Sequence, residues 1–243
     1  MNKEPLLVVG MIGDFCEDTV HLALKSVKDA DKIFFVWGVE SEKTKISLDS
    51  QLNVFSFLTV VNHLYDHSYN GQNGKQRNIY LQMCRDWIKE CNYTQDVWML
   101  VLDPDEVVDD FSKYREYIKN PKKDFVCLKM EHFIDNILKV DASVPVHYAP
   151  ARLFKIKPEI GYSEVEHPVI SFNGNALANN EVDTINDCTI WHLGYIGDVF
   201  KNLKRYKTNL MYSNIHSKKF LRIWYLQHIL GMYPTKRVVT PQL

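Results

Sequence analysis

The residues best suited to chemistry are three carboxylates within four positions, in the run Asp103-Pro104-Asp105-Glu106. They directly follow Val97–Leu102, which we expect to form a buried strand. In an open α/β sheet, ligands bind beyond the carboxyl ends of such strands. Crowded carboxylates repel each other unless a cation lies among them, and oxygen ligands suit Mg²⁺ or Mn²⁺. A plain turn that begins a helix is the alternative, since proline and acidic residues are favoured there.

Two cations, Lys75 and Arg77, lie in the run Gly74–Asn78. This run is expected to open a helix over Gln76–Glu90, just before the acidic strand. Cations at a helix N-terminus oppose the helix dipole, but they can share an anion with the backbone N–H groups. Two solvated surface charges are the alternative. The short connection to the acidic strand favours the anion site.

A third candidate is His192, in the run Trp191–Tyr195. It lies between an expected strand, Thr189–Leu193, and an expected helix that carries Lys201, Lys204, Arg205 and Lys207. A lone histidine is more often a structural group than a metal ligand, so its position alone does not assign it a role.

The elements that must position these residues can be predicted from apolar periodicity. In the first half, strand and helix patterns alternate, which indicates a parallel sheet with right-handed crossovers. These patterns are strand Leu6–Ile12, helix Glu17–Val27, strand Ile33–Trp37 and the apolar run Val54–Val61. The second half has short strands typical of a smaller mixed or antiparallel addition, at Phe125–Met130, Arg152–Ile156, Val169–Phe172 and Thr189–Leu193. Two helices are expected at the end, near Asp198–Tyr212 and Lys218–Leu230.

The composition limits the class of protein. The chain has 243 residues, with 29 Lys and Arg against 30 Asp and Glu, so there is no excess of positive charge for nucleic-acid binding. Five cysteines without a Cys-x-x-Cys spacing predict free thiols in a reducing compartment. No run reaches the roughly 18 apolar residues of a membrane span, and Leu6–Ile12 is expected to be a strand rather than a signal peptide. A cytoplasmic protein is the resulting expectation.

The order of these motifs resembles that of glycosyltransferases of the GT-A fold, in particular the large family-two group that uses nucleotide-diphospho-sugars. The resemblance covers nearly the whole chain. Its blocks are Met11-Ile12, Glu17-Asp18, Ser26-Val27, Ile33–Thr44, Gly74–Asn78, Trp98, Leu100–Val107, Ala151–Phe154, Val165–His167 and Trp191–Tyr195. It implies an α/β fold class: a single GT-A (Rossmann-like) domain, with a mostly parallel central sheet flanked by helices, a small antiparallel addition and C-terminal helices.

The resemblance also implies roles for individual residues. Asp103 would face the nucleotide ribose and the metal, and Asp105 would coordinate Mn²⁺ or Mg²⁺. His192 would be a further ligand of the metal or of the diphosphate. Arg77, together with Lys75, would lie near the diphosphate of the donor. The implied reaction moves a sugar, with inversion, to a hydroxyl of a glycan, glycolipid or protein acceptor.

A carboxylate near the acceptor would act as general base and deprotonate the attacking hydroxyl. Glu166 is the first choice for this role and Glu164 the second. The pair Glu166-His167 reverses the His-Glu order of the family.

Other positions concern the nucleotide. Trp37 stands where the family has an aspartate that contacts the nucleobase, so it is predicted to offer a stacking surface instead. Glu42, in Glu42-x-Thr44, occupies the place of the family's Ser-Thr-Asp-Gly-Thr turn and is counted with the donor-binding residues. Phe15-Cys16 replaces the family's early Asn-Glu pair.

The expected domain organisation has two parts. Residues 1–215 form the GT-A domain, with 1–110 as the half that binds the nucleotide sugar and 111–215 as the acceptor-side half. Residues 216–243 form a C-terminal amphipathic helix and tail. The apolar stripe in Lys218–Tyr233 favours packing on the sheet or on a second copy in a homo-oligomer, with peripheral contact to a membrane surface as the alternative.

Two other functions fit parts of the sequence. The altered Phe15-Cys16 and Trp37 positions are compatible with a GT-A-like protein that binds a nucleotide or glycan without transferring a sugar. A sugar nucleotidylyltransferase would have a layered fold of the same type. That class should show a glycine-rich basic loop after the first strand, and Gly13–Cys16 contains no basic residue.

Overall fold

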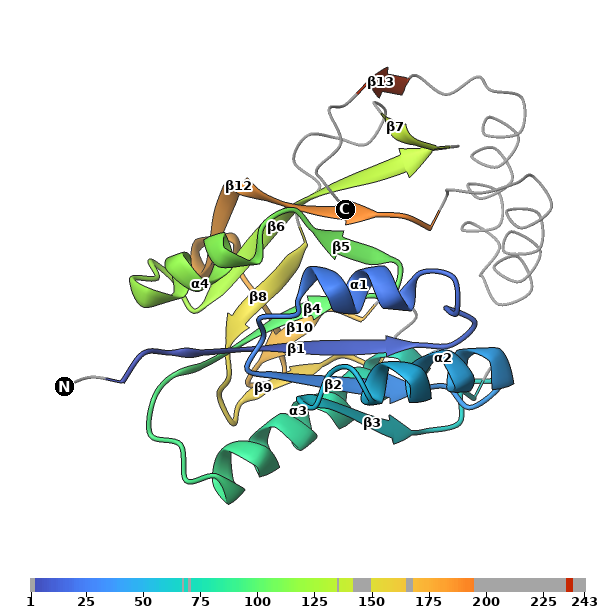
Figure 1. The fold of residues 1–243 in the computed structure, drawn as a ribbon. Coiled ribbons are helices and arrows are strands. Elements are labelled where there is room, and N and C mark those ends of the chain that lie inside the picture. Colours follow the sequence, from blue (N-terminus) through green and yellow to red (C-terminus); the bar gives the residue numbers. More distant parts are fainter. Residues whose placement is uncertain are drawn as a thin grey trace.

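The computed structural model describes residues 3–66, 68–69, 71–134, 136–141, 150–164, 168–194 and 235–237. At the centre of the fold (Figure 1) four parallel strands lie in the order β3-β2-β1-β4. Their bounds are Leu6–Gly13 (β1), Lys32–Trp37 (β2), Leu58–Asn62 (β3) and Val97–Leu102 (β4). The parallel sheet predicted from the alternating first half is therefore confirmed.

The second half adds strands of mixed direction, as predicted, but β6 and β12 are longer than the short strands expected there. Antiparallel to β4 lies β8 (Ala151–Lys155), which in turn pairs with β6 (Phe125–Ile134). Beyond β6, the long strand β12 (Val182–His192) runs parallel to it and also pairs with β5 (Glu106–Val108). From β6 the main order of the sheet also continues through β7 (Asn136–Asp141) to β13 (Thr235–Arg237). A separate antiparallel sheet joins β9 (Ile160–Tyr162), β10 (Ile170–Phe172) and β11 (Asn175–Ala176).

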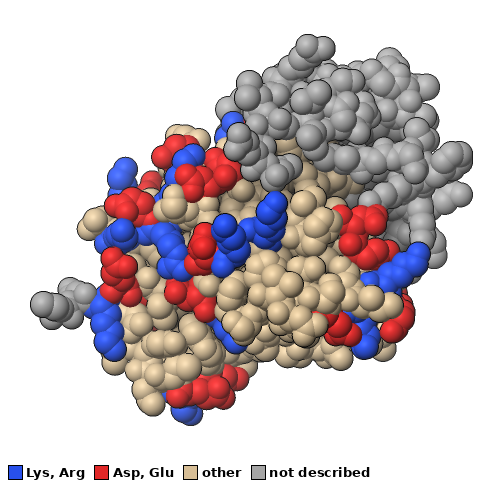
Figure 2. Space-filling model, viewed as in Figure 1, with Lys and Arg blue, Asp and Glu red and all other residues tan. Residues whose placement is uncertain are grey.

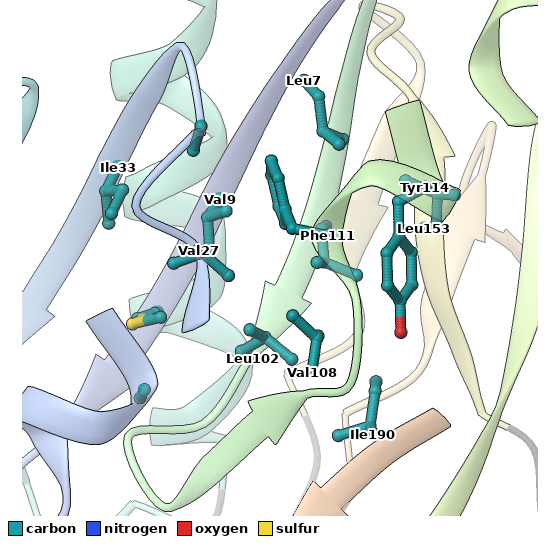
Figure 3. Close-up of a cluster of buried hydrophobic side chains, with 14 of the residues drawn as sticks. Leu7, Val9, Val27, Ile33, Leu102, Val108, Phe111, Tyr114, Leu153 and Ile190 are labelled. Carbon is teal, nitrogen blue, oxygen red and sulfur yellow. The ribbon is translucent and has the colours of Figure 1, made fainter. Parts of the chain in front are cut away.

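Helices cover both faces of the central sheet. Because side chains alternate along a strand, Leu7, Val9 and Met11 of β1 face one layer and Val8 and Ile12 the other. The first layer contains α1 (Val20–Ser26), α2 (Glu42–Leu52) and α4 (Phe111–Lys119), and Figure 3 shows part of its core. The second layer contains α3 (Gln72–Glu90) and the small sheet. Because β1, β2 and β4 run parallel, their carboxyl ends lie together at one edge of the sheet.

Some elements differ from the sequence prediction. Neither α2 nor α4 was predicted, and β3 begins at Leu58 because Val54 is exposed and lies in a turn. The helix α3 begins at Gln72, four residues before Gln76. Tertiary hydrogen bonds explain this earlier start, since Gln72 Nε2 donates to Leu64 O at 3.3 Å and Gln76 Nε2 donates to His63 O at 3.1 Å. The two predicted C-terminal helices lie outside the described residues.

The surface carries charges of both signs. On the face drawn in Figure 2, lysine and arginine side chains are interspersed with aspartate and glutamate, so no large patch of one sign forms there. This mixture agrees with the near-zero net charge of the chain. Among the described residues, no helix combines the length and the apolar character needed to cross a membrane.

The five cysteines are all free thiols, and their different burial predicts how fast each reacts with a thiol reagent. Burial raises the pKa of Cys16, Cys84 and Cys188 to about 12, and it raises the pKa of half-buried Cys127. Cys91 is exposed. At about pH 8, a disulfide reagent should therefore label Cys91 rapidly, Cys127 slowly and the other three only after unfolding. Absorbance of the released thiolate measures this, and the variant C91S should lack the rapid phase.

Candidate functional site

The acidic run forms a tight turn between β4 and β5, at the carboxyl edge of the sheet. The backbone N–H of Glu106 donates to Asp103 O at 2.9 Å, while the backbone N–H of Asp103 donates to Glu106 Oε2 at 2.7 Å. At the end of β12, the N–H of Leu193 donates to Asp105 O at 2.7 Å. The turn is therefore fixed both by its own bonds and by a neighbouring strand.

Two arginines with little exposed surface, at 11% and 13% of their side chains, hold the carboxylates of this turn. Arg77 of α3 forms an ion pair with Asp103, with Nη2 and Oδ1 2.7 Å apart. Arg152 of β8 approaches Glu106 Oε1 to 3.0 Å and Asp103 Oδ2 to 3.5 Å. The Glu106 side chain is only 1% exposed, so it depends on Arg152 for a counter-charge. Asp103 thus faces two guanidinium groups.

These charges shift the pKa values of the two carboxyls in opposite directions. Although burial opposes it, the Arg77 and Arg152 guanidiniums hold the pKa of Asp103 below its ordinary value. Burial raises the pKa of Glu106 to about 7, with Arg152 acting against the rise and Asp103 adding to it. Asp103 is therefore a firmly anionic group. Of these two carboxyls, Glu106 is the one that burial makes easier to protonate.

A second cluster joins Asp105 to two histidines. The β12–β5 register pairs His192 with Glu106, and the β12–β6 register pairs His192 with His132. His192 Nε2 lies 3.5 Å from Asp105 Oδ2, and His192 Nδ1 lies 3.1 Å from His132 Nδ1. Burial, with the nearby His192, lowers the pKa of His132 to about 4, so this ring is neutral near pH 7.

The structure places Trp37 in the core instead of the site surface. Its side chain is 5% exposed and packs in the layer with α1 and α4, so the predicted stacking surface is wrong. The Trp37 Nε1–H donates to Asp14 Oδ1 at 3.0 Å. Asp14 also accepts from the backbone N–H groups of Glu40, at 2.6 Å, and Ser41, at 3.2 Å. These bonds hold Val39 at a φ of 73°, which is costly for a β-branched residue.

Two other predicted donor-binding residues are exposed. Glu42 lies in the first turn of α2, behind the N-cap Ser41, whose hydroxyl accepts from Thr44 N at 3.1 Å. Lys75 lies on the exposed side of α3, and its backbone N–H already donates to Gly71 O at 3.0 Å. The prediction that Lys75 and Arg77 open the helix is therefore wrong. Arg77 is brought to the acidic turn, whereas Lys75 and Glu42 are exposed on α3 and α2.

The second candidate for the general base, Glu164, lies close to the start of α3. Its Oε2 accepts from the Tyr69 hydroxyl at 2.5 Å, and this bond raises the pKa of Tyr69. A Cβ added at Gly74 would lie 2.2 Å from Ser163 O, and one added at Gly71 would lie 2.6 Å from Glu164 O. The backbone before Glu164 therefore packs directly on α3. The first candidate, Glu166, lies outside the described residues.

This close packing makes a prediction for Gly74. Alanine in place of glycine inside a helix normally stabilises by about 1 kcal/mol. Here the added Cβ meets the Ser163 backbone, so Gly74→Ala is expected to destabilise by about 1–3 kcal/mol. Urea unfolding measures the change. Gly161→Ala is the matched control, since its Cβ would have no atom nearer than 3.7 Å. An equal or greater stability of the Gly74 variant would disprove the contact.

The three predicted metal ligands are only partly assembled. Within the described part of the chain, no group of three or more His, Cys, Asp or Glu side chains is arranged to hold a metal ion. Asp103 is turned to its arginines, whereas Asp105 and His192 face each other. One carboxylate and one imidazole fit a Mg²⁺ or Mn²⁺ ion that takes its other ligands from substrate phosphates and water, as Mg²⁺ commonly does. The donor set therefore fits such a cation.

Three residues of the site were not singled out from the sequence as site residues: Asp14, His132 and Arg152. Asp14 directly follows an apolar strand, just as Asp103 does, so its position was a usable signal. Arg152 falls in the run Ala151–Phe154, which belongs to the family resemblance but carries no assigned role there. No local pattern marked His132, because its partner is 60 residues away in the chain.

The parallel β3-β2-β1-β4 sheet, the acidic turn at its carboxyl edge and the small antiparallel addition define a GT-A, Rossmann-like fold. Among solved structures, S. aureus TarS (residues 1–349) matches with a TM-score of 0.50 and 11% identity, over 93% of this chain and 72% of that one. No family model matches the sequence, and no curated protein sequence matches it significantly.

Two other solved structures match with lower scores. A 4-diphosphocytidyl-2C-methyl-D-erythritol synthase has a TM-score of 0.37 and 10% identity, over 64% of this chain and 77% of that one. HddC from Yersinia pseudotuberculosis has a TM-score of 0.39 and 14% identity, over 82% of this chain and 97% of that one.

Proposed function

We propose that this protein is a glycosyltransferase that moves a sugar from a nucleotide-diphospho-sugar to an acceptor hydroxyl, with inversion and with Mn²⁺ or Mg²⁺. The observation that carries the proposal is the pairing of Asp105 with His192 beside the arginine-held Asp103, at the carboxyl edge of a GT-A sheet. Ligands of open α/β sheets bind at that edge. The order of motifs along the chain supports the same function.

The proposed roles follow from charge and position. Asp105 and His192 hold the cation, which when bound neutralises charge on the departing diphosphate. Arg77 and Arg152 keep Asp103 ionised beside the nucleotide ribose, and Arg77 would lie near the diphosphate. Lys75 is exposed on the same helix and supplies positive charge at longer range.

The acceptor hydroxyl needs a base. We assign this role to Glu166, with Glu164 as the second choice. The base takes the hydroxyl proton, the hydroxyl oxygen bonds to the anomeric carbon, and the bond from that carbon to the diphosphate oxygen breaks. Attack on the face opposite the leaving group gives inversion.

We also propose the division of labour along the chain. Residues 1–110 bind the donor and residues 111–215 face a glycan, glycolipid or protein acceptor. Residues 216–243 are proposed as the amphipathic helix and tail, which pack on the domain or on a second copy. The protein is proposed to be cytoplasmic.

Donor hydrolysis and transfer test the function. The purified protein is incubated with UDP-, GDP- and dTDP-sugars in Mn²⁺ or Mg²⁺, with a set of glycan acceptors, and nucleoside diphosphate release is measured. Release from at least one donor, stopped by a chelator, is expected. Nucleotide binding without release would support the non-catalytic alternative. Formation of a nucleotide sugar and pyrophosphate from a nucleoside triphosphate and a sugar phosphate would support a nucleotidylyltransferase.

A further inference from the structure

Two imidazole rings lie side by side on adjacent parallel strands at the candidate site. His132 is on β6 and His192 on β12, and the strand register pairs the two residues directly. The ring centroids are 4.8 Å apart with an interplanar angle of 65°. Their Nδ1 atoms are 3.1 Å apart, which is a normal hydrogen-bond distance between nitrogens.

This contact fixes one proton between the two rings. A hydrogen bond needs one N–H donor and one bare acceptor, and an imidazole nitrogen can be either. If His132 donates, Nδ1 of His192 is bare. The proton of a neutral His192 ring then sits on Nε2, the atom that faces Asp105. If His192 donates from Nδ1, the lone pair of the neutral ring is on Nε2.

Binding of a cation requires the second arrangement. His192 Nε2 lies 3.5 Å from Asp105 Oδ2, the carboxylate that shares the proposed cation. A neutral histidine binds a metal ion through a bare nitrogen, so Nε2 must carry no proton, and the Nδ1–H is left for the 3.1 Å contact with His132 Nδ1. Histidines that bind metals typically donate their second N–H to a neighbouring acceptor, which sets the tautomer and the ring orientation. In this site the acceptor would be a second histidine.

We propose that His132 is a positioning residue whose Nδ1 accepts the Nδ1–H of His192, so that Nε2 of His192 is directed at Asp105 and at a bound cation. His132 itself touches neither the cation nor the substrate. The proposal rests on the proposed function for the presence of the cation. The tautomer of His192 is a separate observable.

Two measurements on one set of variants test the proposal. The variants are His132→Leu, which has no acceptor, and His132→Asn, whose amide oxygen can accept near the position of Nδ1. His21→Asn, at an exposed position on α1, is the control. Nitrogen-15 NMR of the imidazoles reports which nitrogen of His192 carries the proton. Calorimetric titration with Mn²⁺ in the presence of inorganic pyrophosphate reports affinity.

In the parent protein with Mg²⁺ and pyrophosphate, His192 is expected to be protonated at Nδ1. Loss of the acceptor in His132→Leu should weaken Mn²⁺ binding by about 10- to 100-fold, as for other residues that orient metal-ligating histidines. His132→Asn should retain most of the affinity, and His21→Asn should match the parent. The retained affinity of the asparagine variant separates an acceptor role from simple packing.

Three results would overturn the proposal or part of it. A bare Nδ1 on His192 in the parent would show that His132 is the donor. Equal affinities for the parent and His132→Leu, with both proteins folded, would show that the contact does not position His192. If the parent failed to bind Mn²⁺ with pyrophosphate, the cation-dependent function would fail, and the NMR result would still decide the role of His132.

Discussion

Replacement of Arg152 by methionine is expected to lower the free energy of unfolding by about 3–5 kcal/mol, the usual cost of breaking a buried ion pair. Arg152 bonds Glu106 Oε1 at 3.0 Å and approaches Asp103 Oδ2 to 3.5 Å. Without it, Glu106 either keeps an unpaired charge where its side chain is 1% exposed or takes up a proton, and both outcomes cost stability above about pH 7. Methionine fills much of the arginine volume, so the loss reports charge more than packing.

The control for this experiment is an arginine in a similar pair nearer the surface. Arg115 lies 3.0 Å from Asp31, and both side chains are about 30% exposed, at 32% and 28%. Arg115→Met is expected to cost about 1 kcal/mol or less. Denaturant unfolding compares the two variants. Similar losses for Arg115 and Arg152 would contradict the account of a buried, mutually dependent charge cluster.

The pH dependence of the Arg152 variant has a predictable sign. Burial raises the pKa of Glu106 to about 7 in the folded protein, so protonation of Glu106 favours folding. This contribution to stability is complete below the pKa of Glu106 in the unfolded chain and is lost as the pH rises through the folded value. Arg152 opposes this rise, so its removal moves the folded pKa further up. With divalent cations removed, Arg152→Met should therefore be less destabilised at about pH 6 than at about pH 8. Adding Glu106→Gln should recover part of the loss at the higher pH.

The strands were predictable because their signal is local. Buried parallel strands read as continuous apolar runs, and Leu6–Ile12 and Val97–Leu102 lie within one residue of the observed β1 and β4. The acidic turn follows β4 directly, so its place at the sheet edge could also be inferred. The periodicity of Phe111, Tyr114 and Ile118, behind the N-cap Asp110, was a comparable signal for α4.

Other features depend on contacts that no local pattern records. Only Thr44 and Leu48 of α2 are buried, so that helix has little apolar periodicity to detect. Trp37 occupies a position expected to face the nucleotide, yet it is buried and its indole N–H donates to the Asp14 carboxylate. Arg152 reaches the acidic turn across the β4–β8 pair. The sequence thus locates the edge where the site lies, whereas the sheet order decides which side chains meet there.

Asp105→Asn is expected to reduce the rate of sugar transfer by roughly 100- to 1,000-fold, the equivalent of several kcal/mol of transition-state stabilisation from a metal ion. Asparagine has nearly the same shape but cannot supply the negative charge that faces His192 at 3.5 Å. The backbone bond from Leu193 N to Asp105 O does not depend on the side chain, so the fold should persist. Nucleoside diphosphate release under saturating donor measures the effect.

The same variant separates a role in cation binding from a role in folding. In the parent, Mn²⁺ is expected to strengthen nucleoside diphosphate binding, because a cation held by Asp105 and His192 would neutralise charge on the diphosphate. In Asp105→Asn this gain should largely disappear, while binding in the presence of a chelator stays the same. Asp49→Asn is the matched control, because Asp49 forms only an exposed pair with Lys45 on α2. If Asp105→Asn kept both the rate and the Mn²⁺ effect of the parent, the cation would have to bind elsewhere, and the acidic turn would serve the fold alone.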